Sequence, residues 1–337
     1  MTRFFEKLTP RAFGAIRHFI DNTTLASFYL FITCSIKRKI MPENQAVTKP
    51  VKIGNFELYT VETGRFMLDG GAMFGVVPKT LWSRKIQADE KNRIPMATRC
   101  LLIRSAATDR LYLVDNGCGD KFDEKMSGIY SLDYENSDLE RSLGKLGVKP
   151  EDITDMVFTH LHFDHCGGTT TYSNNGDLVH RFNQATYHIN KRHWETATKP
   201  NAREKASFLK ENIEPIANYP KLNLLDDRHT FEEGFTTIPA DGHTIGQQLP
   251  YIFDDKRIFV YGADLIPTYA HVPLPWVMAY DMSPIQTLKE KEHFLKEAAA
   301  KNWYLYLEHD AENEIITVAH ENNRFSVQST ITMQELA

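Results

Sequence analysis

From Lys52 onward, the pattern of apolar and polar positions along the chain is typical of a layered α/β fold. Short segments that alternate apolar with polar residues, or that are continuously apolar, indicate strands. Longer segments with apolar residues three and four positions apart indicate amphipathic helices. The strand-like segments are residues 56–61, 100–103, 110–114, 156–158, 236–238, 258–261 and 303–307, and the helix-like segments are residues 138–146, 191–198, 203–212 and 283–301. Because the two types alternate, the sequence predicts strands and helices in layers.

The helix-like segment at 138–146 has recognisable ends. Ser137 precedes its apolar positions and Glu140 follows three residues later, which is the pattern of a capping box. Gly147 follows the last apolar position and is a typical helix stop. The chain then continues into the apolar run 156–158, which predicts a buried strand directly after this helix.

The residues just past that strand carry the chain's most informative motif. From His160 to His165 the sequence reads H-x-H-x-D-H, with His162 and Asp164 between. Imidazole and carboxylate are the ligands that zinc and similar divalent metals prefer. If the segment stays extended, His160 and His162 project to the same side and can share one ion. Asp164 and His165 follow after a turn and can face a second ion. Surface histidines on a polar loop are the alternative interpretation, which the position at a strand end disfavours.

Three more residues of metal-ligand type each follow a strand-like segment. They are His243, Asp264 and His309. One such residue would more often be structural, but three in this order after the motif are not easily explained by chance. Asp115 follows the segment 110–114 in the same way, and there an Asp that caps a turn is an equally good interpretation.

With these motifs in order, residues 50–315 resemble the metallo-β-lactamase superfamily. The resemblance implies an α/β protein with a four-layer αββα sandwich, in one domain over residues 46–337. It also implies two divalent metal ions, for which Zn²⁺ is the expected metal. By the family pattern, the first ion is held by His160, His162 and His243, the second by Asp164, His165 and His309, and both by Asp264, while Asp115 orients a ligand by hydrogen bonding.

Three further stretches make the chain most similar to the quorum-quenching lactonases that open N-acyl-homoserine lactones, which are related to the methyl parathion hydrolases. These stretches are residues 68–79, 89–94 and 262–267. Class B β-lactamases fit less well, because they usually have Cys where this chain has Asp264. The best-known lactonases have a substrate-contacting Tyr three residues after the bridging Asp. This chain has Pro267 there, and Tyr269 is the nearest residue that could replace that Tyr.

The resemblance implies a metal-dependent hydrolase that acts on ester bonds, with lactonase as the expected activity. Metal binding lowers the pKa of water from about 15.7 towards 7, so that a hydroxide bridging two ions would attack the ester carbonyl. Asp164 is the candidate to relay the proton, although a role as ligand only is equally compatible, and Tyr269 is the second candidate catalytic residue. Met73, Phe74 and Trp276 are candidates for the substrate pocket, since apolar residues suit an acyl chain; their alternative interpretation is the core.

Other functions stay open within this resemblance. An organophosphate triesterase, or another esterase or thioesterase, would use the same pair of ions. A mononuclear-iron sulfur dioxygenase needs only two histidines and an aspartate, and the complete second set of ligands, which includes His309, disfavours it. A ligand-sensing module with residual hydrolysis is the remaining alternative.

Composition and net charge limit the classes of molecule that this protein is expected to bind. The chain of 337 residues is 42% hydrophobic and 25% charged, as is usual for a soluble globular protein. Its net charge of −5 argues against nucleic acid or an anionic membrane as a partner. The four cysteines form no C-x-x-C pair, which is compatible with a reducing compartment, and we expect a cytoplasmic protein. The expected partner is a small-molecule ester or lactone, and a homodimer is also compatible with the sequence.

Residues 1–45 differ from the rest of the chain. Lys and Arg outnumber Asp and Glu there, and residues 25–36 form an apolar stretch. The stretch is too short to span a membrane, so we expect no stable membrane insertion. Three interpretations are open: a helical appendage, an atypical export signal, or residues that precede a true start at Met41. We therefore divide the chain into an N-terminal extension over residues 1–45 and a hydrolase domain over residues 46–337.

Overall fold

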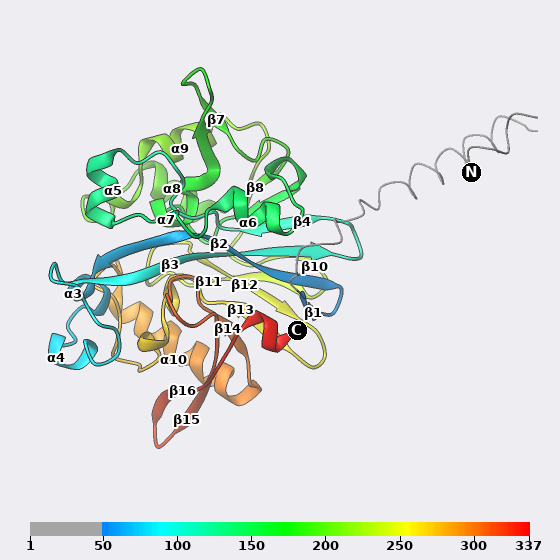
Figure 1. Cartoon of the computed structure of the whole chain (residues 1–337). Helices are drawn as coiled ribbons and strands as arrows, with labels where there is room; N and C mark the ends of the chain where they lie inside the picture. Colours follow the sequence, from blue (N-terminus) through cyan, green and yellow to red (C-terminus); the bar gives the residue numbers. More distant parts are fainter. Residues whose placement is uncertain (1–48) are drawn as a thin grey trace, which may run out of the picture. The chain divides into compact units, whose positions relative to one another are not determined.

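In the computed structural model, which describes residues 49–337, two seven-stranded sheets are stacked with helices on both outer faces (Figure 1). This architecture confirms the four-layer αββα sandwich that the family resemblance implies. The expected N-terminal extension lies outside the described residues and stays a prediction. Among the helices of residues 49–337, none combines the length and the apolar character needed to cross a membrane.

The first sheet is antiparallel on one side and parallel on the other. Its order is β1-β2-β3-β4-β5-β8-β9, with antiparallel pairs up to β4 and parallel pairs beyond it. Its strands are β1 (Val51–Ile53), β2 (Phe56–Asp69), β3 (Arg93–Ser105), β4 (Leu111–Val114), β5 (Asp155–Val157), β8 (Thr186–Asn190) and β9 (Leu222–Leu225), and a separate ribbon pairs β6 (Thr170–Tyr172) with β7 (Leu178–His180). Parallel strands end at one edge of the sheet, and the H-x-H-x-D-H motif follows β5 there.

The second sheet is antiparallel except at its centre. Its order is β10 through β16 in sequence, and β13 and β14 are its parallel pair. Its strands are β10 (His229–Glu232), β11 (Phe235–Pro239), β12 (Gln248–Phe253), β13 (Ile258–Tyr261), β14 (Tyr304–Tyr306), β15 (Ile315–Glu321) and β16 (Arg324–Ile331). The connection between β13 and β14 contains the longest described helix, α10 (Pro284–Lys301), which makes the crossover that parallel neighbours require.

Helices cover the outer face of each sheet. In Figure 1, α5 to α9 lie on the side of the first sheet and α10 on the side of the second. The helices besides α10 are α3 (Gly70–Phe74), α4 (Lys79–Trp82), α5 (Glu124–Tyr130), α6 (Leu139–Lys145), α7 (Phe163–Cys166), α8 (Lys191–Thr198), α9 (Lys210–Ala217) and α11 (Met333–Leu336), and the 3-10 turns are η1 (Pro150–Asp152), η2 (Gly167–Thr169), η3 (Lys205–Ser207), η4 (Ala263–Leu265) and η5 (Tyr269–His271).

The helix expected over residues 138–146 is α6, but its cap differs from the sequence prediction. Asp138, not Ser137, is the N-cap residue, and its Oδ1 accepts a hydrogen bond of 2.7 Å from the backbone N–H of Arg141. Either side chain can cap a helix, so the choice depends on where the chain enters the first turn.

The helix predicted over residues 203–212 is wrong in its bounds, because only the short turn η3 and the start of α9 fall there. The side chain of Asn201 accepts hydrogen bonds from the backbone N–H groups of Arg203 and Glu204. Such a local bond competes with helix formation. It also directs Glu204 inward, where that carboxylate contacts the site described below.

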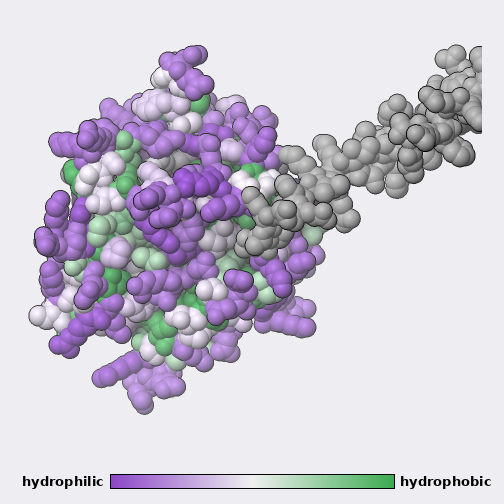
Figure 2. Space-filling view, in the orientation of Figure 1, coloured by the Kyte–Doolittle hydropathy of each residue, from purple (hydrophilic) through white to green (hydrophobic). Residues whose placement is uncertain are grey.

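The apolar core has three parts, which together hold the layers in place. Between the sheets, Phe56 packs edge-on against Phe235 with ring centroids 5.9 Å apart. Between the first sheet and its helices, Leu143 and Tyr187 belong to a second cluster. A third cluster, which includes Trp82, lies around α3 and α4. The face shown in Figure 2 is mostly hydrophilic with small scattered apolar patches, as expected when the apolar side chains fill these layers.

Candidate metal centre

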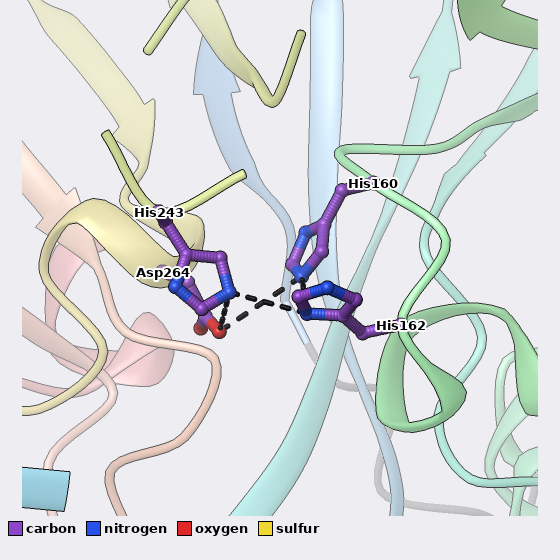
Figure 3. Close-up of side chains that lie close together, drawn as sticks. All are labelled: His160, His162, His243 and Asp264. Carbon is purple, nitrogen blue, oxygen red and sulfur yellow. Dashed lines mark hydrogen bonds and ion pairs between the residues drawn. The ribbon is translucent and has the colours of Figure 1, made fainter. Parts of the chain in front are cut away.

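Four side chains from three separate segments meet just beyond the ends of β5 and β13 (Figure 3). His160 Nε2 lies 3.1 Å from His162 Nδ1, and His243 Nε2 lies 3.2 Å from that same nitrogen. Asp264 Oδ2 lies 3.0 Å from His243 Nε2 and 3.9 Å from His160 Nε2. All four side chains are buried. Four potential ligand atoms therefore surround one small volume.

A second group adjoins the first through Asp264. His165 Nε2 lies 3.1 Å from His309 Nε2, and each is 3.8 Å from an oxygen of Asp164. Asp264 Oδ1 lies 3.1 Å from His309 Nε2, whereas its Oδ2 faces His243. The structure thus brings all seven residues that the sequence selects as ligands into two adjoining groups, with one carboxylate between them.

Strand ends bring these residues together. His160 follows β5 by three residues, and His243 lies in the connection between β11 and β12. Asp264 and His309 follow β13 and β14, which are parallel neighbours and so end at the same edge of the second sheet. The ligand-type residues that follow strands of the first sheet therefore face those that follow strands of the second sheet, at one edge of the sandwich.

His193, in α8, holds the first part of the motif extended. Its Nε2 accepts a hydrogen bond of 2.7 Å from the backbone N–H of Leu161, and its Nδ1 donates to Ile245 O at 2.9 Å. Burial lowers the pKa of His193 to about 3, so the ring is neutral and can accept at Nε2. It ties the residue between His160 and His162 to the loop that carries His243. No spacing pattern in the sequence signals this contact.

Two glycines let the chain after the motif turn back against a neighbouring segment. A Cβ at Gly167 would lie 2.0 Å from Cys118 O, and a Cβ at Gly119 would lie 2.2 Å from Gly167 O. The backbone N–H of Asn116 donates to His165 O at 2.8 Å in the same contact. Any side chain at these glycines would force the two backbones apart and displace α7, which carries Asp164 and His165.

The outer nitrogen of each imidazole has its own acceptor, and this decides where the proton lies. The pairs are His160 Nδ1 with Thr159 Oγ1, His162 Nε2 with Glu204 Oε1, His165 Nδ1 with Asp115 Oδ2, His243 Nδ1 with Asp281 Oδ1, and His309 Nδ1 with Ala97 O. Thr159 accepts because its own hydroxyl donates to Asp115. Each inner nitrogen of a neutral ring then carries a lone pair. Five lone pairs and two carboxylates facing one another fit divalent cations.

Asp115 supports the motif from behind. Its Oδ1 accepts from the backbone N–H of Thr159 at 2.8 Å, and its Oδ2 accepts from the Thr159 hydroxyl at 2.6 Å. The same Oδ2 lies 3.1 Å from His165 Nδ1. Glu308 Oε2 lies 3.0 Å from that nitrogen as well, and burial raises the pKa of Glu308 to about 7. Sequence reasoning identified Asp115 but gave no role to Glu308.

Two more carboxylates that the sequence reasoning missed orient ligand rings. Asp281 Oδ1 is 3.0 Å from His243 Nδ1, and Glu204 Oε1 is 3.4 Å from His162 Nε2. Glu204 also accepts hydrogen bonds from the Thr244 hydroxyl and from Asn201 Nδ2. Such carboxylates set the tautomer and raise the basicity of the inner nitrogen.

Protons compete with cations at this cluster. Burial lowers the pKa of His243 and His309, but Asp264 outweighs that effect and raises the pKa values to about 10 and about 9. Burial raises the pKa of Asp264, yet His243 and His309 hold it well below its ordinary value. The metal-free cluster therefore keeps His243 and His309 protonated at neutral pH, and those protons must leave when a divalent cation binds to these two rings.

A cavity of about 250 Å³ opens onto the two groups. Besides His162, Asp164, His243, Asp264 and His309, its lining consists of Leu68, Met73, Met96, Tyr130, Phe163, Arg203, Glu204, Ala206, Ser207, Met278, Ala279, Tyr280 and Met282. Of the three pocket residues that the sequence selects, Met73 alone is in this lining. Phe74 is fully buried behind it, and Trp276 packs edge-on against Phe74 with ring centroids 5.7 Å apart.

The structure does not bring Tyr269 into this cavity. Its backbone N–H donates to Asp310 Oδ2 at 2.8 Å, and its hydroxyl donates to Lys85 O at 2.5 Å. The ring lines a neighbouring cavity together with Pro95 and Asp310. Tyr130 and Tyr280 are the tyrosines that line the cavity at the metal cluster.

Comparison with known proteins agrees with the motifs. A family model described as the metallo-β-lactamase superfamily matches residues 93–309. An N-acyl homoserine lactonase from Bacillus cereus is 30% identical over 114 residues, which are 34% of this chain, and the chain spans 38% of the length of that lactonase. An N-acyl homoserine lactonase from Bacillus thuringiensis is 26% identical over 111 residues, which are 33% of this chain and 37% of the length of that lactonase.

Solved structures share the fold over most of the chain. A probable metal-dependent hydrolase from Staphylococcus aureus is 29% identical with a TM-score of 0.74, covering 83% of this chain and 100% of its own. AidC, a dizinc quorum-quenching lactonase in complex with a product, is 24% identical with a TM-score of 0.67, covering 85% of this chain and 99% of its own. At that identity, the likeness to AidC shows the fold alone.

Proposed function

The chain belongs to the metallo-β-lactamase superfamily, and from this we propose that it is a dinuclear-metal hydrolase that opens the ester ring of lactones, with N-acyl homoserine lactones as its substrate class. One observation carries the proposal. Five buried imidazoles direct their inner nitrogens into one space beside Asp164 and Asp264, and the outer nitrogens are all engaged elsewhere. Bound cations would offset the energetic cost of burying these lone pairs and carboxylates together.

We assign the ligands from the two groups and the carboxylate between them. The first ion would be held by His160, His162 and His243, the second by Asp164, His165 and His309, and both by Asp264. Zn²⁺ is the proposed metal, because this set contains only imidazole and carboxylate ligands and a structural neighbour, AidC, is described as a dizinc lactonase.

When bound, two such ions lower the pKa of a water molecule towards 7 and polarise an ester carbonyl. The side chains of the protein position the two ions and transfer a proton. Asp264 directs one oxygen to each group of imidazoles and so fixes the spacing of the two positions. Asp164 lines the cavity, where its carboxylate can take the proton of the attacking water and return it to the leaving alcohol oxygen. Tyr280 and its neighbours Met278, Ala279 and Met282 also line the cavity.

The cavity supports a lactone with an apolar acyl chain. Much of its lining is apolar, and Tyr130 and Tyr280 add hydroxyl groups. Burial raises the pKa of both phenols, so that each stays a hydrogen-bond donor at neutral pH and can meet a carbonyl oxygen of the substrate. Curated relatives that match part of the chain are N-acyl homoserine lactonases, which favours the same substrate class.

A substrate panel tests the proposal. We expect the zinc-loaded protein to have its highest kcat/KM on N-acyl homoserine lactones, and lower values on thioesters, phosphotriesters and β-lactams. Metal analysis should find about two ions per chain. A higher kcat/KM on a phosphotriester than on every lactone would instead make the protein an organophosphate triesterase, and one bound iron would point to an oxygenase.

Ligand variants test the assignment. His160→Ala, His243→Ala and Asp264→Ala should each lose hydrolysis by about a thousandfold or more, because each removes a group that holds an ion. Their circular dichroism spectra should remain those of a folded protein. His320→Ala is the matched control, since His320 is exposed in β15. Near-normal turnover by Asp264→Ala would refute its bridging role.

A further inference from the structure

Arg99 is a buried cation whose side chain lies outside the two groups of ligand-type residues. It belongs to β3 of the first sheet and is 2% exposed. Its Nη1 donates hydrogen bonds to Leu307 O at 2.7 Å, to Asp310 O at 2.9 Å and to Asn313 O at 3.3 Å. All three carbonyls belong to the connection between β14 and β15, which also carries His309. The guanidinium thus holds the backbone on both sides of a candidate metal ligand.

This contact joins the two sheets beside the metal cluster. The β14–β15 connection belongs to the second sheet, whereas β3 belongs to the first (Figure 1). The backbone extends the contact, because the N–H of Ala97 donates to His309 O at 3.1 Å and the N–H of Arg99 donates to the next carbonyl along, Glu308 O, at 3.0 Å. In the second group of ligands, the H-x-H-x-D-H motif follows a strand of the first sheet, and His309 follows a strand of the second. The spacing within that group therefore depends on this contact.

A carboxylate of the neighbouring strand holds the guanidinium from its other end. Glu62 lies in β2, and its Oε1 accepts a hydrogen bond of 2.7 Å from Arg99 Nε. Burial lowers the pKa of Arg99, but Glu62 outweighs that effect and raises this pKa above its ordinary value. The side chain therefore stays charged, and hydrogen bonds from a charged donor are roughly twice as strong as those between neutral groups.

The β14–β15 connection is also held together internally. Asp310 Oδ1 accepts hydrogen bonds from the backbone N–H of Glu312 at 3.0 Å and from the backbone N–H of Asn313 at 2.7 Å. These bonds close a turn directly after His309. Without the guanidinium, this turn would keep its local shape but could shift against β3, and the imidazole of His309 would shift with it.

We propose that Arg99 is a positioning residue that sets the affinity of the second metal position, by holding His309 at the required distance from the H-x-H-x-D-H motif. This inference rests on the proposed dinuclear centre and adds the residue that joins its two halves. Bonds from zinc to nitrogen are about 2.0–2.1 Å long, so a small displacement of one ligand weakens binding. The first position should be insensitive, since its ligands follow β5, β11 and β13.

Arg99→Met tests this role, because methionine keeps much of the length of the side chain and removes every donor. Metal-free protein would be titrated with zinc in a calorimeter. We expect the second dissociation constant to rise by about tenfold or more, since residues that orient metal ligands typically contribute 10–100-fold to affinity, and the first to stay within about threefold.

Arg110→Met is the matched control. Arg110 pairs with buried Asp155 at 2.6 Å, and Asp155 begins β5, at the end of that strand opposite to the motif. The variant removes an arginine from an ion pair of the same sheet without touching the β14–β15 connection. Both dissociation constants for zinc should therefore stay within about threefold of the wild-type values.

The position that loses affinity can be identified with a second metal. His309→Ala removes a ligand of the second position, so its remaining ion marks the first. With one equivalent of Co²⁺, Arg99→Met and His309→Ala should give the same visible absorption spectrum, because both hold the ion at the first position. A different spectrum in Arg99→Met would show that the first position has changed as well, which contradicts the proposal.

Hydrogen–deuterium exchange of the metal-free protein gives a readout that needs neither metal nor turnover. Peptides from residues 307–313 should exchange faster in Arg99→Met than in the wild type, whereas peptides from residues 160–165 should exchange alike. Arg99→Lys should give an intermediate rate, because its ammonium can donate to carbonyls of the connection but cannot also bind Glu62 through a fixed fork.

Two results of the zinc titration would overturn the proposal. One is a second dissociation constant in Arg99→Met equal to that of the wild type. The other is an equal loss at both positions, which would make Arg99 a residue of general stability. If Arg99→Met does not fold, Arg99→Lys decides the question: a loss of about threefold or more at the second position alone supports the proposal, and no loss refutes it.

The titration also separates this inference from the proposed function. A wild-type protein that binds two zinc ions but opens no lactone would refute the lactonase function, while the comparison with Arg99→Met would still decide the role of Arg99. A wild-type protein that binds one ion would refute the dinuclear centre and this inference together.

Discussion

Asp281 Oδ1 lies 3.0 Å from His243 Nδ1, on the side of the ring that faces away from the metal cluster. Both side chains are almost completely buried, and β12 and β13 separate them in the sequence. The carboxylate fixes the proton on Nδ1 and leaves the Nε2 lone pair directed at Asp264 and His162. Glu204 orients His162 in the same way. There the carboxylate faces Nε2, and Nδ1 is the nitrogen directed at the cluster.

Asp281→Ala should weaken metal binding at the first position. Removing a carboxylate that orients a ligand ring typically costs 10–100-fold in metal affinity, and we expect a loss on the order of that range. Competition with a chromogenic chelator would measure it. Asp255→Ala is the control, because Asp255 is an exposed residue of the β12–β13 turn. Unchanged zinc affinity in Asp281→Ala would contradict the role given to this residue.

Zinc binding to the metal-free protein should release protons. His243 and His309 have pKa values raised to about 10 and about 9, so both rings are protonated at pH 8 and must become neutral to bind a metal. We expect release on the order of two protons, and an affinity for zinc that increases with pH until both rings are neutral. Calorimetric titration at one pH in buffers of different ionisation enthalpy counts the protons. The same heat in every buffer would show that no proton leaves.

Tyr280→Phe and Tyr130→Phe should reduce kcat/KM on an N-acyl homoserine lactone by about tenfold, the effect of losing one hydrogen bond to the substrate. Tyr269→Phe should leave kcat/KM unchanged, because its hydroxyl donates to Lys85 O outside the cavity. It should instead lower the free energy of unfolding by about 1 kcal/mol. Steady-state kinetics and urea unfolding of the three variants check both statements, and an activity loss in Tyr269→Phe alone would reverse the assignment.

Lys291 should make stability depend on pH above neutrality. Burial lowers the pKa of this ammonium from 10.5 to about 7, against the opposing charge of Asp281. Between these two values the unfolded chain binds the proton and the folded protein does not, so the free energy of unfolding rises with pH, by at most about 1.4 kcal/mol per pH unit. Below pH 7 both states are charged and the contribution is constant.

Lys291→Met tests this directly. Urea unfolding of the wild type and the variant at several pH values from 7 to 10 should give a smaller slope for the variant, because the titrating group is gone. Lys289→Met, on the exposed side of the same helix, should keep the wild-type slope. Parallel curves for the wild type and Lys291→Met would show that Lys291 does not titrate in this range.

The outcome for individual residues shows how far local sequence patterns reach. His160 to His165, His243, Asp264 and His309 could be selected because each follows a strand-like segment, and ends of strands meet in an α/β fold. Tyr269 was selected for its distance from Asp264 along the chain, but the bond from its backbone N–H to Asp310 directs its side chain to a neighbouring cavity. Distance along the chain does not predict the direction of a side chain.

The sequence by itself determined the layered α/β class and the ligand-type residues of the cluster, because periodicity and ligand type are properties of short segments. Only the tertiary structure decided which nitrogen of each ring faces the cluster, since that depends on acceptors such as Asp281 and Glu204 that pack there from distant segments. It also decided that Met278 lines the cavity while Phe74 lies behind it. Both are apolar residues near the same site, and only close packing in three dimensions distinguishes the layer that meets a ligand from the layer that supports it.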